Sequence, residues 1–275
     1  MKSIVGCFRL TNIIPDAYSI QKAEYPEQLG EMAAYLSDWS EKLTKCFDDN
    51  PDYKLGDTLP DYHNTPNHFA KLIEAARQDK HGRYKAAAAK KLMAFYESHV
   101  DKYSLIMDGI KNNAIAQGVI HRDPKINNFM YNSFWNTIQA LIDLDTIYYH
   151  PFAIDISDAT RAIASEPETE RDLRKVYANI SYLKPLLHNY LKNIGHLLTP
   201  TDWENMQDYL AIIGLELGIR FFGDYLMGDE YFKIIDYPSQ NFDKAWNQAT
   251  VSQSLFDQSD EIKAIIEECY VYKKK

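Results

Sequence analysis

A β-hairpin pattern in the middle of an otherwise helical chain is the feature that most limits what this sequence can fold into. Residues 129–131 (FMY) are followed by the polar turn NSFWNT, and residues 138–145 (IQALIDLD) form a second run that ends in carboxylates. Two short runs around a polar turn are typical of a hairpin. Because almost everything else from Gln28 onward has a helical character, we predict a mostly α, α+β fold with one embedded hairpin.

The remaining segments are predicted from periodicity and composition. Helices are expected where apolar residues recur at spacings of three and four or where alanine is abundant. These stretches are residues 28–43, 68–79, 84–99, 101–118, 171–198, 201–226 and 254–270. Thr201 or Asp202 is expected to be the N-cap of the sixth helix. Residues 3–20 are instead rich in β-branched and aromatic side chains, which predicts two short strands or one bent strand.

A polar loop separates a short apolar pair from the hairpin, and it carries the chemistry. It reads HRDPKINN over residues 121–128, and the hairpin then ends at Asp143-Leu144-Asp145. On a strand, residues two apart point to the same face, so both carboxylates are expected on one side. Carboxylate and amide oxygens suit Mg²⁺, and a further carboxylate can orient or deprotonate a hydroxyl. These are the groups that phosphoryl transfer needs.

Each of these residues also has a structural explanation. Asp and Asn in loops commonly form turns or caps, and the DLD segment can be a solvated strand end. The order and spacing of these residues taken together favour the catalytic interpretation over the structural one. His121, Asp123, Asn128 and Asp143 follow the order and spacing of a kinase catalytic loop, in which the Asn comes five residues after the Asp.

The segment HRDPKINNFMYN…ALIDLDT resembles the aminoglycoside phosphotransferase and choline kinase-like superfamily, which has a protein-kinase-like fold. It is most similar to N-acetylhexosamine 1-kinase-type sugar kinases, whose loop reads H-x-D-T-K-x-x-N before I-D-L-D-T. FRLTNIIPDAYSI, LPDYHNTPNHFAKLIEAARQD and DISDATR extend the resemblance from about Phe8 to beyond Arg161. The resemblance implies a kinase-like C-terminal lobe over residues 28–275, with residues 1–27 as the remnant of an N-terminal β lobe and hinge.

The resemblance also implies roles for individual residues. Asp123 would be the catalytic base, Asn128 and Asp143 would bind the Mg²⁺ that bridges the phosphates of ATP, and Asp145 would be a further metal candidate. His121 would support the catalytic loop through backbone hydrogen bonds.

Four further residues are candidates for phosphate or substrate contacts, and each has a competing structural reading. They are Lys125, His63, Asp158 and Arg161. Lys125 can equally be a solvated loop lysine, and His63 a histidine satisfied in the core. Asp158 and Arg161 are spaced i, i+3, so an ion pair on a helix is the structural reading.

The sequence departs from the family pattern in two ways. Pro124 stands where the family has Thr, and the residues after the metal-binding segment differ, so the acceptor is not inherited from the resemblance. No glycine-rich loop and no strand lysine precede the catalytic loop, although kinases need both to cover and hold the phosphates. We therefore expect little turnover from this chain alone. Three explanations for the missing loop and lysine are considered: truncation, a degenerate relative that binds without catalysing, and a lobe supplied by another chain. Activity only in a version extended upstream would support truncation, and inactivity in both versions would favour the binding protein.

Composition restricts the class of partner. The formal net charge of −9 disfavours nucleic acid, which needs a basic face. The three cysteines are far apart and odd in number, so we expect a reducing, cytoplasmic setting, and we expect no membrane span. The predicted partner is a small hydroxylated molecule, a sugar or amino sugar, with aminoglycoside, choline and homoserine as alternatives. An unpaired strand near residues 4–10 would further allow a dimer through its exposed edge.

Overall fold

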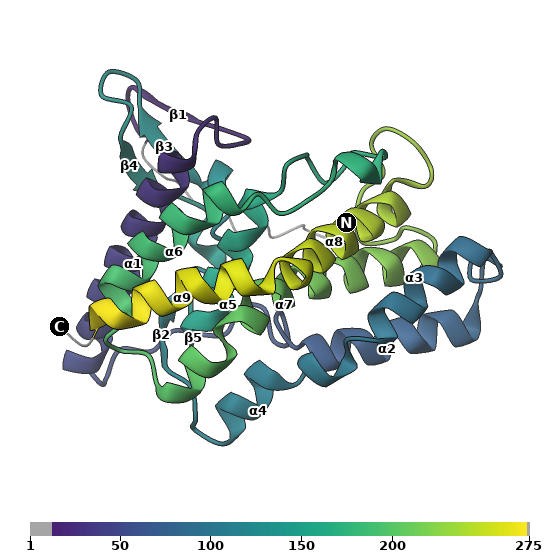
Figure 1. The fold of residues 1–275 in the computed structure, drawn as a ribbon, viewed down its shortest axis with the longest axis horizontal. Helices are drawn as coiled ribbons and strands as arrows, with labels where there is room; N and C mark the ends of the chain where they lie inside the picture. The colour runs from purple at the N-terminus through teal and green to yellow at the C-terminus, as the bar shows by residue number, and fades with distance from the viewer. Residues whose placement is uncertain (1–12, 274–275) are drawn as a thin grey trace, which may run out of the picture.

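The structure is a computed structural model that describes residues 13–273 (Figure 1). Two small antiparallel sheets are embedded among the helices. One sheet has the order β1-β3-β4, and the other pairs β2 with β5. The strands are β1 (Ala17–Ser19), β2 (Gln117–Ile120), β3 (Phe129–Asn132), β4 (Ile138–Leu141) and β5 (Tyr148–Pro151). The predicted mostly α, α+β architecture with an embedded hairpin, β3–β4, is confirmed.

Helices make up most of the remainder. The α-helices are α1 (Pro26–Asp49), α2 (Thr65–Gln78), α3 (Ala87–Glu97), α4 (Leu105–Lys111), α5 (Phe152–Thr160), α6 (Ile180–Ile194), α7 (Pro200–Met227), α8 (Gln240–Asp257) and α9 (Ser259–Lys273). Short 3₁₀ turns are η1 (Val100–Lys102), η2 (Ile126–Asn128), η3 (Leu144–Thr146), η4 (Arg161–Ile163) and η5 (Leu173–Lys175). Among the described residues, no helix is both long enough and apolar enough to span a membrane.

Two hydrophobic clusters hold these elements together. The larger one joins α1, α5, α6 and α9 to the inner faces of the strands, and α1 lies along α6. The smaller one joins α2 and α3 to α7 and α8. Figure 1 shows the β1–β3–β4 sheet at one end of α1 and the α2–α3 pair at the opposite side of the molecule. Helix α7 contributes to both clusters, so it connects the two halves of the fold.

The N-terminal helix follows its sequence closely. Leu29, Met32 and Leu36 are fully buried, as their spacing predicts, and Pro26 occupies the first turn, where its missing N–H costs no hydrogen bond. Before it, β1 pairs with β3, so this segment forms one sheet with the β3–β4 hairpin. The predicted strand at residues 4–10 lies outside the described residues, and the predicted dimer therefore stays a prediction.

Several details of the sequence prediction are wrong. The helix expected over residues 101–118 is confined to α4, because residues 117–120 form β2, which pairs with β5. The helix expected over residues 254–270 is interrupted at Gln258, between α8 and α9. The N-cap of α7 is Thr199, whose side chain and that of Asp202 form a reciprocal capping box around Pro200. The helix expected from residue 171 begins only at Ile180, because Asn179 caps it and residues 164–179 form a loop with one bridge. Finally, β4 ends at Leu141, two residues before the first aspartate of the DLD segment.

Candidate active site

The polar loop begins where β2 ends, and a buried carboxylate on α5 holds its first two residues. Asp155 accepts hydrogen bonds from the main-chain N–H groups of His121 at 2.9 Å and Arg122 at 2.8 Å. Asp155 is completely buried, and burial raises the pKa of its carboxyl. These two charge-assisted bonds tie the start of the loop to the helical core.

His121 connects the loop to the hairpin, as its predicted supporting role requires. Its Nε2 lies 2.9 Å from the carbonyl oxygen of Ile142, and because a carbonyl only accepts, Nε2 carries the proton. Its Nδ1 can then accept from the main-chain N–H of Asp123 at 3.3 Å. Thr146 donates to the His121 carbonyl at 2.6 Å. All these contacts lie within the protein, so the geometry fits a support role better than proton transfer.

Arg122 has a left-handed backbone, with φ of 69°, which is uncommon for a residue other than glycine. Its guanidinium donates to the Asp57 carboxylate and to the Leu59 carbonyl, each at 2.9 Å. The side chain is therefore tied to the connector between α1 and α2. The hydrogen bond from the Arg122 N–H to Asp155 and the contacts of the guanidinium together hold the loop in this left-handed turn.

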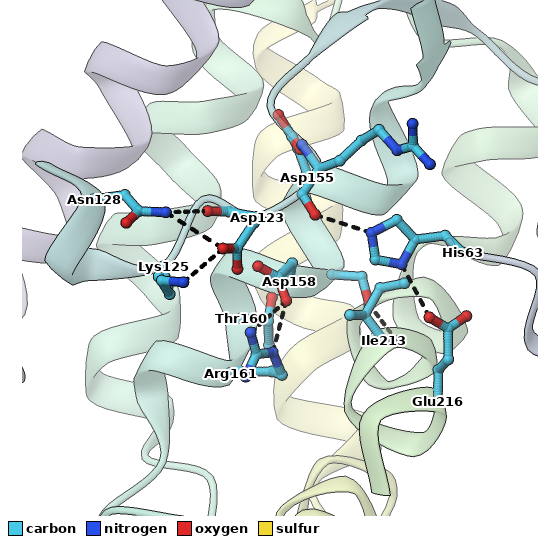
Figure 2. Close-up of polar contacts among 12 residues, drawn as sticks. His63, Asp123, Lys125, Asn128, Asp155, Asp158, Thr160, Arg161, Ile213 and Glu216 are labelled. Carbon is cyan, nitrogen blue, oxygen red and sulfur yellow. Dashed lines mark hydrogen bonds and ion pairs between the residues drawn. The ribbon is translucent and has the colours of Figure 1, made fainter. Parts of the chain in front are cut away.

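Asp123 lies at the centre of a charged cluster (Figure 2). Its Oδ2 is 2.7 Å from Lys125 Nζ, and the same ammonium is 3.9 Å from Asp143 Oδ2. Asn128 donates through Nδ2 to the main-chain carbonyl of Asp123 at 2.8 Å. Three predicted site residues from two segments therefore meet around Asp123, with a cation already between two carboxylates.

The DLD segment reaches this cluster by a turn rather than a strand. Asp143 adopts a left-handed backbone, with φ of 63°, and η3 follows directly. The expectation that Asp143 and Asp145 point to one face of a strand is therefore wrong, because neither residue is in a strand. Asp143 comes within reach of Lys125, whereas Asp145 is tied elsewhere through its main-chain carbonyl, which accepts from Thr58 at 2.6 Å. The metal-binding role of Asp145 stays a prediction.

The donor set fits a magnesium–nucleotide site. Because Asn128 uses its amide N–H group on the loop, its side-chain oxygen is left for another partner, and Asp143 adds a half-exposed carboxylate. No group of three or more His, Cys, Asp and Glu residues suitable for a metal occurs within residues 13–273. Magnesium in nucleotide sites is held by one or two carboxylates together with phosphate and water oxygens. Two protein ligands therefore suffice for Mg²⁺ arriving with ATP.

The buried Asp158 forms an ion pair with Arg161, whose side chain is 21% exposed, beside this cluster. Asp158 Oδ1 lies 2.7 Å from Arg161 Nε and 2.6 Å from Nη2. The other oxygen, Oδ2, is buried and has no hydrogen-bond partner among the described residues. Burial raises the pKa of Asp158, and the Asp123 carboxylate adds to this effect. The pair thus presents one unused acceptor oxygen close to Asp123.

His63 is buried, and both ring nitrogens are already used. Its Nδ1 is 3.0 Å from Glu216 Oε1, and its Nε2 is 2.9 Å from the Arg122 carbonyl (Figure 2). This geometry places His63 against the polar loop and leaves no ring nitrogen to contact a substrate. The contact with Glu216 was not anticipated, although an acidic residue inside the apolar run AIIGLELGIRFF was a signal that could have identified it.

Two cavities lie near the charged cluster. The first, which we call the polar cavity, has a volume of about 330 Å³ and no aromatic side chain in its wall. Its wall includes Lys22, Lys125, Asp158, Arg161 and Asn247. Asn247 is fully buried, and its Oδ1 has no hydrogen-bond partner among the described residues. Three of the four residues predicted to contact phosphate or substrate therefore share one cavity.

The second, which we call the aromatic cavity, has a volume of about 530 Å³ and lies between the connector, α2 and α7. The Arg220 guanidinium lies 5.1 Å from the centre of the Tyr62 ring, 5.8 Å from Tyr231 and 5.6 Å from Phe232. Tyr62 lines this cavity. Burial raises the pKa of the Tyr62 hydroxyl, and the charges of Asp123 and Asp158 add to this effect. Sequence reasoning missed Tyr62 and Arg220.

The mostly helical α+β fold is similar to that of a choline kinase. The crystal structure of choline kinase from Cryptosporidium parvum Iowa II is similar to this chain with a TM-score of 0.50 and 13% sequence identity. The similarity covers 96% of this chain and 74% of that one, and at this identity it concerns the fold alone.

The sequence itself defines the family. The model of the phosphotransferase enzyme family, APH, matches residues 15–190, which include the polar loop and Asp143. This chain belongs to that family. The predicted kinase-like fold and phosphotransferase membership are thereby confirmed, whereas the narrower similarity to N-acetylhexosamine kinases is not tested by these matches.

Proposed function

We propose that this protein transfers the γ-phosphoryl group of ATP to a hydroxyl of a small, neutral, hydroxylated acceptor, with Asp123 as the base. The observation that carries the proposal is the position of Asp123 in a rigid loop, facing Lys125 and next to Asp143. A carboxylate so placed can accept the proton of an attacking hydroxyl. Phosphoryl transfer depends mainly on positioning and on electrostatic stabilisation, which this loop supplies.

Asn128 and Asp143 would hold Mg²⁺, which neutralises phosphate charge when it is bound. Lys125 supports this role because its ammonium already bridges the Asp123 and Asp143 carboxylates, at 2.7 and 3.9 Å. The site between these carboxylates therefore favours positive charge. When Mg²⁺ and nucleotide are bound, Lys125 is free to turn from Asp123 toward the transferred phosphoryl group, since its side chain is 42% exposed.

The polar cavity is the proposed acceptor site. The unused oxygens of Asp158 and Asn247 can each accept a hydrogen bond from an acceptor hydroxyl, and Arg161 can donate one. Its charged wall residues balance, with Lys22, Lys125 and Arg161 against Asp158, Glu166 and Glu168. A volume of about 330 Å³ lies within the range of small-molecule sites and suits a monosaccharide.

Cationic acceptors fit these surroundings less well. A quaternary ammonium such as choline is recognised by a cage of aromatic rings, and the polar cavity has none. In the aromatic cavity, Arg220 already lies against Tyr62, Tyr231 and Phe232. A cationic acceptor bound there would be repelled by the Arg220 guanidinium. The arrangement therefore favours a neutral sugar, such as an N-acetylated amino sugar, over choline or an aminoglycoside.

The decisive experiment combines acceptor binding with transfer. Saturation-transfer NMR and ADP release would be measured with N-acetylglucosamine, glucose, choline and kanamycin in the presence of ATP and Mg²⁺. We expect sugar binding that Asn247→Leu weakens. Transfer to the sugars should be slow in this chain, and in any active form Asp123→Asn should remove most of it. Preferential use of choline or kanamycin would refute the acceptor assignment. Sugar and ATP binding without any transfer, also in a version extended upstream, would favour a non-catalytic binding protein.

A further inference from the structure

A buried chain of polar contacts links helix α7 to the catalytic loop. Glu216 on α7 is 1% exposed, and its Oε1 lies 3.0 Å from His63 Nδ1. Its other oxygen accepts from Thr65 Oγ1 at 2.7 Å. His63 Nε2 lies 2.9 Å from the main-chain carbonyl oxygen of Arg122 (Figure 2). Four groups from three segments thus form one continuous network beneath the loop.

The partners determine where the protons lie. The Arg122 carbonyl can only accept, so His63 Nε2 must carry a hydrogen. A carboxylate also only accepts, so Nδ1 carries a second hydrogen that it shares with Glu216. Although burial raises the pKa of Glu216, the adjacent His63 outweighs it and leaves that pKa below its usual value. The network is therefore a buried ion pair with one N–H aimed at the loop.

The Arg122 carbonyl belongs to the peptide group that joins Arg122 to Asp123. The N–H of the same peptide group, that of Asp123, donates to His121 Nδ1 at 3.3 Å. The anchors of Arg122 itself lie elsewhere: Asp155 holds its N–H, and Asp57 holds its guanidinium. Because Arg122 has a left-handed backbone, its turn persists only when the surroundings fix it. His63 is the one side chain among the described residues that donates to that carbonyl, and at 2.9 Å its contact is shorter than the 3.3 Å contact of the Asp123 N–H with His121. His63 therefore holds the carbonyl side of the peptide plane from which the Asp123 side chain projects.

We propose that His63 and Glu216 are positioning residues that hold the Arg122–Asp123 peptide plane and so aim the Asp123 carboxylate at the acceptor. The catalytic part of this statement depends on the proposed function, whereas the positioning part does not. His63 acts through Asp123 and touches neither acceptor nor nucleotide.

The test separates stability from loop geometry. His63→Phe keeps an aromatic ring beside Tyr62 but leaves Glu216 buried without its partner, so the urea midpoint should fall. Adding Glu216→Leu removes the unpaired carboxylate and should restore the midpoint. Hydrogen exchange of residues 119–128 should nevertheless remain about tenfold faster than in the parent, because the Arg122 carbonyl still lacks its donor. If loop protection recovers together with the midpoint, the proposal is wrong.

Two further variants complete the design. Glu216→Gln should preserve loop protection, since a neutral His63 can keep its Nε2 proton and accept from the glutamine through Nδ1; loosening of the loop would overturn the proposal. His196→Phe, at a surface histidine 3.4 Å from Glu41, should leave the loop unchanged. Where turnover is measurable, the double variant should lower kcat and leave the KM for the acceptor unchanged. Loss of exchange protection without any turnover in the parent would support positioning while refuting the kinase activity.

Discussion

Replacement of Gly118 by alanine tests how tightly the strand before the polar loop is packed. Gly118 lies in β2, two residues before the strand ends. A Cβ atom at this position would lie 2.3 Å from Phe152 Cζ and 2.4 Å from Thr44 Oγ1. Both neighbours are buried, so neither can move aside freely.

The expected change in the free energy of unfolding combines two destabilising contributions and one stabilising contribution. Overpacking of this kind costs about 1–3 kcal/mol. If Thr44 shifts, it also weakens its hydrogen bond from the main-chain N–H of Val119, now 2.9 Å long, which is worth about 0.5–1.5 kcal/mol. Alanine reduces the entropy of the unfolded chain and returns about 0.4–1 kcal/mol. The net expectation is a loss of about 2 kcal/mol in the free energy of unfolding.

Urea unfolding of the purified chain measures this loss, with Gly56→Ala as the matched control. No atom lies within 4 Å of the Cβ position at Gly56, so that variant should change stability by less than about 0.5 kcal/mol. Combining Gly118→Ala with Phe152→Leu makes the contacting side chain smaller and should recover part of the loss. If Gly118→Ala is as benign as Gly56→Ala, the packing argument for β2 is refuted.

Two variants of the candidate site make further predictions. Asp123→Asn should lower phosphoryl transfer by about 10²–10⁴ in any active form while the unfolding transition stays intact, and near-full activity would contradict its role as base. Arg161→Met should cost about 3–5 kcal/mol in urea unfolding near neutral pH, because it leaves the Asp158 carboxylate buried without its ion-pair partner. Because burial raises the pKa of Asp158, the folded variant takes up a proton there as the pH falls, and its loss of stability relative to the parent should become smaller under acid conditions. A loss of stability that does not change with pH would contradict this reasoning.

The sequence alone predicts the elements that depend on the local spacing of apolar and polar residues. The apolar stripe of α1 faces the core, and the FMY run pairs with the following strand as a hairpin. The polar loop was recognised because its residue types and spacing are chemically unusual, and the structure brings Asp123, Asn128 and Asp143 together. Periodicity and spacing carry this information without any tertiary contact.

What the sequence could not predict depends on tertiary contacts and backbone geometry. The DLD segment alternates like a strand, yet Asp143 leaves the sheet through a left-handed turn that no periodicity records. Glu216 and Arg220 lie on a long apolar helix, and only the packing of the connector brings Tyr62 and His63 against them. Pairing across more than one hundred residues is decided by the packed fold and not by local sequence.

Magnesium-dependent ATP binding is the measurement that tests the central assignment most directly. Calorimetric titration of the chain with ATP, with and without Mg²⁺, should detect weak binding that requires the metal. Asn128→Ala and Asp143→Ala should each abolish the magnesium-dependent part, while Asp101→Ala, at an aspartate whose side chain is 73% exposed beside α4, should not change it. Metal-dependent nucleotide binding that is unchanged in the Asn128 and Asp143 variants would contradict the account.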